Sequence, residues 1–272
     1  MEWAANLDAA AFGALVAAAS GVLVPRIIER VPEPEPDEPN EPGDADQSGQ
    51  PGQSDEAGAA GADGQAPRFE GASQPDEGPK ETYVAIADRS GLLWKCVLTA
   101  LVCGGLIGRA VGWDWSLLFL LPMVPVSLAL TVIDWRTKLL PTWLIARTYV
   151  GLIVLVLVAT LATQDWDDLI RAGIGWAGAG LLFFVLWYIH PRGLGYGDVR
   201  LSGILGIALG WVGTAELVVG IYAAFLLGGV GGALLSRLRI VDRKGFPFGP
   251  FMFVGALAGL LVGDWVAGLT TM

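Results

Sequence analysis

The sequence is poor in the side chains that bind transition metals and form disulfides, with one histidine and two cysteines among 272 residues. The cysteines, Cys96 and Cys103, lie seven positions apart in one apolar segment, and a disulfide cannot span two turns of a helix. A structural zinc site needs about four such ligands. We therefore expect core packing for both cysteines, no metal and no cofactor.

Charged residues are also scarce, at 16% of the chain, whereas hydrophobic residues make up 53%. This composition excludes an ordinary soluble domain and is typical of a protein with several membrane spans. The formal net charge of -10 comes from one stretch, because residues 31–80 hold 13 acidic residues against Arg68 and Lys80. The membrane part is nearly neutral, and we expect the lipid bilayer as a partner and no nucleic acid.

The acidic stretch has nine of the 16 prolines and almost no large aliphatic side chain. Such a segment cannot bury enough apolar surface to offset the entropy lost on ordering. The sequence therefore predicts three parts: an N-terminal transmembrane helix at 1–30, a disordered cytoplasmic linker at 31–90, and a membrane-embedded core at 91–272.

Apolar windows predict an all-α polytopic fold with about eight spans. The expected spans are 7–28, 92–112, 115–133, 142–163, 168–189, 199–212, 214–235 and 249–268. Lys and Arg gather in alternate connections and acids in the others, and short cytoplasmic loops carry the positive charge. This alternation predicts that both termini lie outside the cell membrane.

On this topology two aspartates reach the cytoplasmic surface from distant parts of the chain. Asp134 ends the third predicted span and Asp198 begins the sixth. Carboxylates at a membrane boundary are costly to bury, and two that come close cannot both ionise cheaply. One protonated and one ionised carboxyl supply a general acid and a general base, as in aspartic proteases.

Gly195 and Gly197 flank Tyr196 directly before Asp198. We expect these glycines to permit positive φ and a close approach of an extended substrate. A flexible turn with Asp198 as an ordinary helix N-cap is the alternative interpretation.

Three motifs together carry a resemblance to a known family. They are Asp134 followed by Pro141, then Gly195-Tyr-Gly-Asp-Val-Arg-Leu201, then Phe246-Pro-Phe-Gly-Pro-Phe251 before the last span. In this order they resemble the type IV prepilin peptidase family over residues 91–272.

The resemblance implies that Asp134 and Asp198 are the catalytic pair of a membrane aspartic endopeptidase. Such enzymes cut the short basic leader from prepilins or pseudopilins at the cytoplasmic face, just before the pilin's hydrophobic helix. The residues expected to bind substrate or shape the site are Gly195, Gly197, Arg200, Pro141, Pro247, Gly249 and Pro250.

The chain departs from the family pattern at three places. Thr142 follows Pro141 where Asp or Asn is frequent, and we expect its hydroxyl to cap the next helix; Arg200 stands where Lys is usual. Many bacterial members carry two Cys-x-x-Cys pairs between the first two helices and also methylate the new pilin N-terminus. This interval has no cysteine here, so we do not expect methylation.

Two other classes of function remain open. An ion-coupled transporter would also place carboxylates in a membrane, although no inverted repeat is visible and the acids lie at one surface. A catalytically silent scaffold of a pilus or secretion system would keep the fold without the chemistry. The sequence names neither the pilin nor the oligomeric state.

Overall fold

The computed structural model describes residues 6–33, 81–191, 194–237 and 247–270, and all regular structure in these ranges is helical. The chain forms two units, 1–32 with 81–272, and 33–80. Residues 34–80 of the linker expected at 31–90 therefore fall outside the described residues. The helices are α1 (Leu7–Gly21), α2 (Val24–Glu29), α3 (Tyr83–Ala87), α4 (Leu92–Val111), α5 (Leu117–Thr137), α6 (Thr142–Thr163), α7 (Trp166–Ile189), α8 (Tyr196–Val212), α9 (Thr214–Arg237) and α10 (Gly249–Thr270).

Six of these helices, α4 to α7, α9 and α10, are long and apolar enough to cross a membrane. The all-α, polytopic prediction is confirmed. The count of eight is not, because the helices at the other two expected spans are shorter, α1 with 15 residues and α8 with 17. At about 1.5 Å per residue these reach only about 22 and 26 Å.

The first predicted span, 7–28, is two helices rather than one. α1 ends at Gly21, and α2 begins at Val24 with Pro25 in its first turn. Proline has no N–H to donate to the carbonyl four residues earlier, so the helix cannot continue unbroken through this position.

The interval expected to be a linker up to residue 90 holds the helix α3 near its end. The Thr82 hydroxyl accepts a hydrogen bond of 3.3 Å from the Ala85 amide and caps this helix. Tyr83 and Ile86 are buried, and α3 packs against α2. The apolar pattern Tyr83, Ile86 and Ala87 buries one face of α3, so order begins before the first span of the core.

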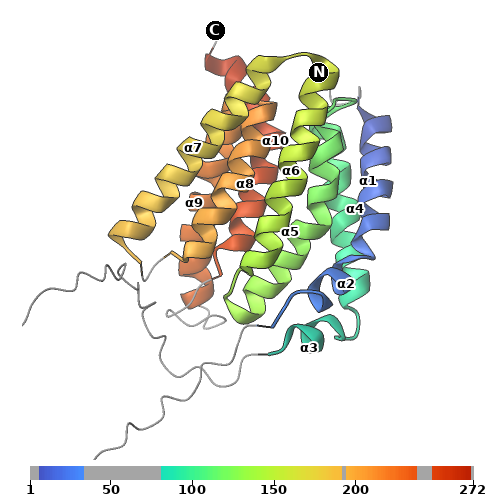
Figure 1. Cartoon of the computed structure of the whole chain (residues 1–272), viewed down its shortest axis with the longest axis vertical. Coiled ribbons are helices and arrows are strands. Elements are labelled where there is room, and N and C mark those ends of the chain that lie inside the picture. The colour runs from blue at the N-terminus through green and yellow to red at the C-terminus, as the bar shows by residue number, and fades with distance from the viewer. Residues whose placement is uncertain (1–5, 34–80, 192–193, 238–246, 271–272) are drawn as a thin grey trace, which may run out of the picture. The chain divides into compact units, whose positions relative to one another are not determined.

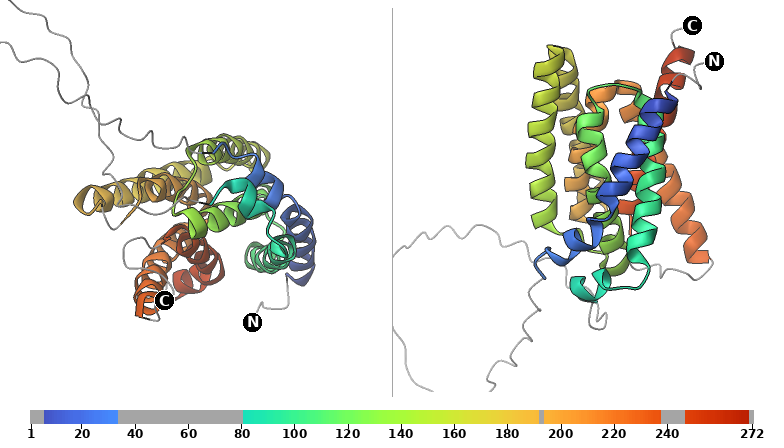
Figure 2. Two further views of the ribbon diagram at one scale, coloured as in Figure 1. Left: turned by 90° about the horizontal axis from the view of Figure 1, so that it is seen from below. Right: turned by 90° about the vertical axis from the view of Figure 1, so that its right-hand side faces the viewer.

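Close pairs of helices build the bundle, and glycines set their spacing. Gly13 of α1 faces Gly104 of α4, and a Cβ on either would collide with the backbone carbonyl of the other. Gly175 of α7 and Gly206 of α8 form the same kind of contact. Small residues let backbones approach closely, which is how helices gain packing energy in a lipid environment. Figure 2 shows α1 alongside α4.

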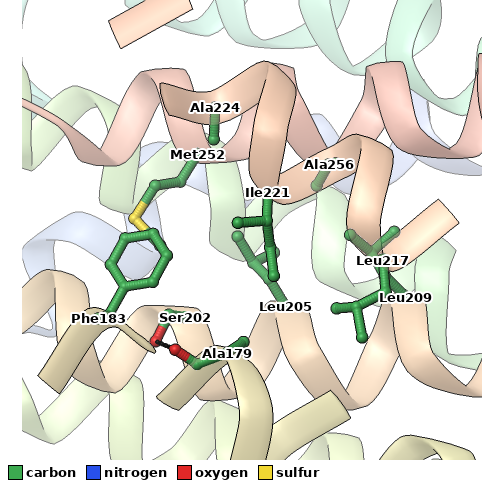
Figure 3. Close-up of a pocket in the computed structure, with 11 residues that line it drawn as sticks. Ala179, Phe183, Ser202, Leu205, Leu209, Leu217, Ile221, Ala224, Met252 and Ala256 are labelled. Carbon is green, nitrogen blue, oxygen red and sulfur yellow. Dashed lines mark hydrogen bonds between the residues drawn. The ribbon is translucent and has the colours of Figure 1, made fainter. Parts of the chain in front are cut away.

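α8 is largely buried and packs against α6, α7, α9 and α10. Near its C-terminus Trp211 is buried, meets Phe119 of α5 edge to face at 5.3 Å, and donates a 3.2 Å hydrogen bond to Thr160 of α6. On another face of α8 the packing leaves a cavity of only about 20 Å³. Figure 3 shows this cavity with Met252 directed at the ring of Phe183, and Ser202 bonded to the Ala179 carbonyl. This core is filled rather than open to a ligand.

The start of α1 and the end of α10 lie at one end of the bundle (Figure 1). The C-terminus of α5 and the N-termini of α8 and α10 lie together at the other. We call the latter the aspartate end, because Asp134 and Asp198 belong to it. The same-end placement expected from the charge pattern is thus observed.

Candidate active site

Asp134 lies in the last turn of α5 and is only 4% exposed. The apolar run indicated that the helix ends at Asp134, but α5 continues for three more residues, to Thr137. Oδ2 of Asp134 accepts a 2.9 Å hydrogen bond from the amide of Gly249, the first residue of α10. Amides in the first turn of a helix have no partner within the helix and favour a negative group. The start of α10 therefore provides the carboxylate with its donor.

Asp198 is the third residue of α8 and is 6% exposed. Its Oδ2 accepts a 3.0 Å hydrogen bond from the amide of Gly195, which holds the N-cap position. Asp198 is therefore not the N-cap itself, as the alternative interpretation had it. Its side chain closes the first turn of α8 by reaching back to the N-cap amide.

The two carboxyl groups are close enough for the charge of Asp134 to act on Asp198. They come from different motifs and different helices, and both are buried. Two such groups in a site with little water repel one another when both are ionised, so the arrangement favours a single shared proton. Among the described residues no cluster of three metal-binding side chains occurs.

The glycines before Asp198 act differently from the expectation. Gly195 has φ -74° and Gly197 is helical, so neither has the positive φ that we predicted. The close approach exists at Gly197, but it is made by this chain itself. A Cβ at Gly197 would lie 2.7 Å from the Cβ of Leu140, which precedes Pro141. Gly197 thus lets the α5–α6 connection pack against the start of α8.

The Arg200 side chain contacts α6 rather than the carboxylate of Asp198. Its guanidinium donates to the Thr142 hydroxyl and lies 4.6 Å from the centre of the Tyr196 ring. The Arg200 carbonyl also accepts a 2.8 Å hydrogen bond from the Tyr149 hydroxyl of α6. The predicted capping role of Thr142 is wrong, because Pro141 holds the N-cap position of α6 and has no side-chain cap bond.

The last motif is held by aromatic packing. Phe248 lies 5.6 Å from Phe225 of α9 and 6.1 Å from Phe183 of α7, measured between ring centres. Pro247 is buried, and Pro250 follows Gly249 in the first turn of α10, where proline needs no donor. A Cβ at Gly249 would lie 2.8 Å from Oδ2 of Asp134. Only glycine therefore brings this amide to the carboxylate without displacing it.

Residues 121–236, which hold both aspartates, match the type IV leader peptidase family. The chain is similar to that family over this region. The three motifs that carry the resemblance lie on α5, on α8 and at the start of α10, and they meet around one buried site.

Several curated relatives from bacteria carry the name prepilin leader peptidase/N-methyltransferase. The Escherichia coli K12 protein is 34% identical over 148 residues, covering 52% of this chain and 61% of that protein. The Pectobacterium carotovorum protein is 33% identical over 176 residues, covering 64% and 55%. The Pseudomonas aeruginosa PAO1 protein is 29% identical over 175 residues, covering 62% and 58%. The chain thus spans little more than half the length of these relatives. No solved structure matches significantly.

The sequence motifs did not indicate two residues that build this site. Leu140 fixes the start of α8 through Gly197, and Tyr149 ties α6 to α8 through the Arg200 carbonyl. Leu140 could have been noticed as an apolar residue directly before Pro141, in a connection that also holds Arg136 and Lys138. Nothing in the sequence distinguishes Tyr149 from an ordinary tyrosine at a membrane boundary.

Proposed function

We propose that the chain is a membrane aspartic endopeptidase that removes the short basic leader from type IV prepilins or pseudopilins, with Asp134 and Asp198 as its catalytic pair. The observation that carries the proposal is the meeting of two buried carboxyls from separate family motifs. Each accepts one hydrogen bond from a backbone amide, Asp134 from Gly249 and Asp198 from Gly195. Among the described residues, the charge that acts on Asp198 is that of Asp134.

The reaction requires one ionised and one protonated carboxyl. The ionised aspartate takes a proton from water as the oxygen attacks the scissile carbonyl carbon, while the protonated aspartate donates to the carbonyl oxygen. The C–N bond then breaks, and the amine leaves with a proton from the pair. The Gly249 and Gly195 amides hold the two carboxyls in place during these transfers.

An apolar groove of about 210 Å³ favours a substrate with a hydrophobic helix. It lies between α4, α5, α8 and α10, and it extends to Pro250, the neighbour of Gly249. Thr131, on the same groove, is three residues before Asp134. A pilin helix in this groove would place the peptide bond that precedes it beside the two aspartates.

We further propose that the aspartate end faces the cytoplasm in the cell membrane. Exposed arginines at this end of the bundle support the orientation, since short cytoplasmic loops carry excess positive charge. They include Arg30 at the end of α2, Arg136 in α5 and Arg147 in α6. The opposite end has Asp114, Asp165, Asp167 and Asp168.

We propose cleavage without N-methylation. The interval between the first helix and the core has no cysteine. The match to the Escherichia coli relative, which is named as an N-methyltransferase as well, covers only 61% of that protein. Incubation of the cleaved pilin and a labelled methyl donor with the purified protein tests this point. Label on the new pilin N-terminus would contradict it.

Co-expression with candidate prepilins tests the peptidase itself. Leader removal is expected with the wild-type chain and is expected to be lost with Asp134→Asn and with Asp198→Asn. Asp88→Asn is a matched control, because Asp88 is an exposed aspartate near the same end, after α3. Cleavage that survives both site substitutions would exclude this pair, and no cleavage of any pilin would favour the silent scaffold.

A further inference from the structure

A second cleft opens at the aspartate end of the bundle, and neither of the two carboxyls is among its lining residues. It has a volume of about 370 Å³ and lies between the connection from α3 to α4, the first turn of α4 and the last turns of α5. Its walls combine cationic, aromatic and aliphatic side chains. The lining residues are Ile86, Arg89, Ser90, Leu92, Lys95, Thr131, Val132, Trp135 and Arg136.

The cleft has an excess of positive charge. Arg89 is paired with Glu81 at 2.5 Å. Lys95 and Arg136 are both exposed, and in the described ranges no ion pair joins either to a carboxylate. Two cations that line one cleft repel each other, so an anion between them removes this repulsion and adds attraction to both. The cleft is therefore electrostatically suited to a negative group.

The same cleft is apolar on its inner side. Ile86 is fully buried, and Val132 and Leu92 are half-buried against the core. Trp135 is 43% exposed and lies at the end of a membrane-spanning helix, a position that tryptophan favours at the headgroup level. Because α4 and α5 are both long enough to span a bilayer, a cleft at their ends lies near the lipid headgroups.

We propose that this cleft binds the phosphate group of an anionic phospholipid, held between Lys95 and Arg136. Basic clefts between helix ends with an apolar inner wall match an anionic headgroup that continues into acyl chains. The bound lipid would hold the start of α4 to the end of α5. Arg136 is two residues after Asp134, so the lipid would also restrain the helix end that carries the carboxyl. This binding does not depend on the proposed peptidase activity.

Lipid titration of the purified full-length protein in neutral detergent, read by native mass spectrometry, tests the proposal. Phosphatidylglycerol and phosphatidylcholine with the same acyl chains separate headgroup charge from apolar contact. K95Q/R136Q is expected to lower the affinity for phosphatidylglycerol roughly tenfold to thirtyfold, since each basic residue near an anionic surface contributes about 1 kcal/mol. The phosphatidylcholine affinity is expected to stay unchanged.

Three controls define the outcome. R30Q/R237Q removes two exposed cations outside the cleft and is expected to leave the binding intact, and so is K95R/R136K, which keeps the charge. Equal loss in the R30Q/R237Q variant, or none in K95Q/R136Q, would overturn the site. Inorganic phosphate alone is expected not to raise the unfolding temperature. If it stabilises the protein as much as the lipid does, the ligand is a soluble anion and the lipid assignment fails.

Discussion

The amide of Gly249 donates a 2.9 Å hydrogen bond to Oδ2 of Asp134, across 115 positions of sequence. This bond connects the family's third motif to its first. The Pro-Phe-Gly-Pro stretch thus has a direct physical relation to one proposed catalytic group, in addition to opening the last helix.

Gly249→Ala is expected to lower prepilin cleavage about a hundredfold, because small displacements of a reacting group cost rates of this order. The new Cβ would lie 2.8 Å from Oδ2 of Asp134, and the amide would have to withdraw. Initial cleavage rates of the purified variant measure the effect. Gly268→Ala is the control in the same helix, since a Cβ there would meet nothing within 4 Å. Equal loss in both variants would mean that the effect does not depend on the contact between Gly249 and Asp134.

Gly197→Ala is expected to reduce cleavage and the unfolding temperature together, because its Cβ would lie 2.7 Å from the Cβ of Leu140. Leu140→Gly removes the opposing atom, so the double variant should recover part of the loss seen with Gly197→Ala. Groups in direct contact show such coupling, whereas distant ones act independently. Strictly additive effects in unfolding and cleavage assays would show that Leu140 does not set the position of α8.

The contact between Arg200 and Thr142 is expected to stabilise the bundle by about 1 kcal/mol, since hydrogen bonds with a charged donor at a partly exposed site are of this order. Arg200→Gln and Thr142→Val should each lower the apparent unfolding temperature, and the double variant should lower it no further. Arg200→Lys keeps the charge and should retain cleavage. A double variant whose effect equals the sum of the two would argue against the bond.

Ser127→Phe tests the apolar groove. Ser127 lines it, and a phenyl ring would occupy part of its volume of about 210 Å³. The KM for full-length prepilin should rise, whereas cleavage of a short peptide that spans the leader junction should not change. Val150→Phe on α6 is the control, because Val150 is 66% exposed and lies outside the groove. An equal change for both substrates would place the pilin helix elsewhere.

The sequence predicted the helical fold and the meeting of Asp134 and Asp198 at one end, because hydrophobic length and loop charge directly reflect the bilayer. It misplaced helix boundaries where polar residues continue a helix. Trp135, Arg136 and Thr137 extend α5 beyond its apolar run, and α8 begins at Tyr196, three residues before the expected span 199–212. Glycine is unfavourable within a helix, but in the first turn it interrupts few hydrogen bonds.

The reason for Gly197 could not be predicted, because it depends on a neighbour from another helix connection. Positive φ is the usual local reason for glycine, and it was the wrong one here. The hydrogen-bond donor to Asp134 could not be predicted either, because the Gly249 amide meets this carboxylate only when α10 packs against α5. Local sequence reports local conformation, and these contacts are set by the tertiary fold.

Phe248 is one residue from the Gly249 amide and is packed against Phe183 of α7 and Phe225 of α9. The position of the donor to Asp134 is therefore mechanically linked to two helices that contribute no polar group to the site. A change in the spacing of α7 and α9 would therefore act on the carboxyl through Phe248 and the peptide unit that follows it.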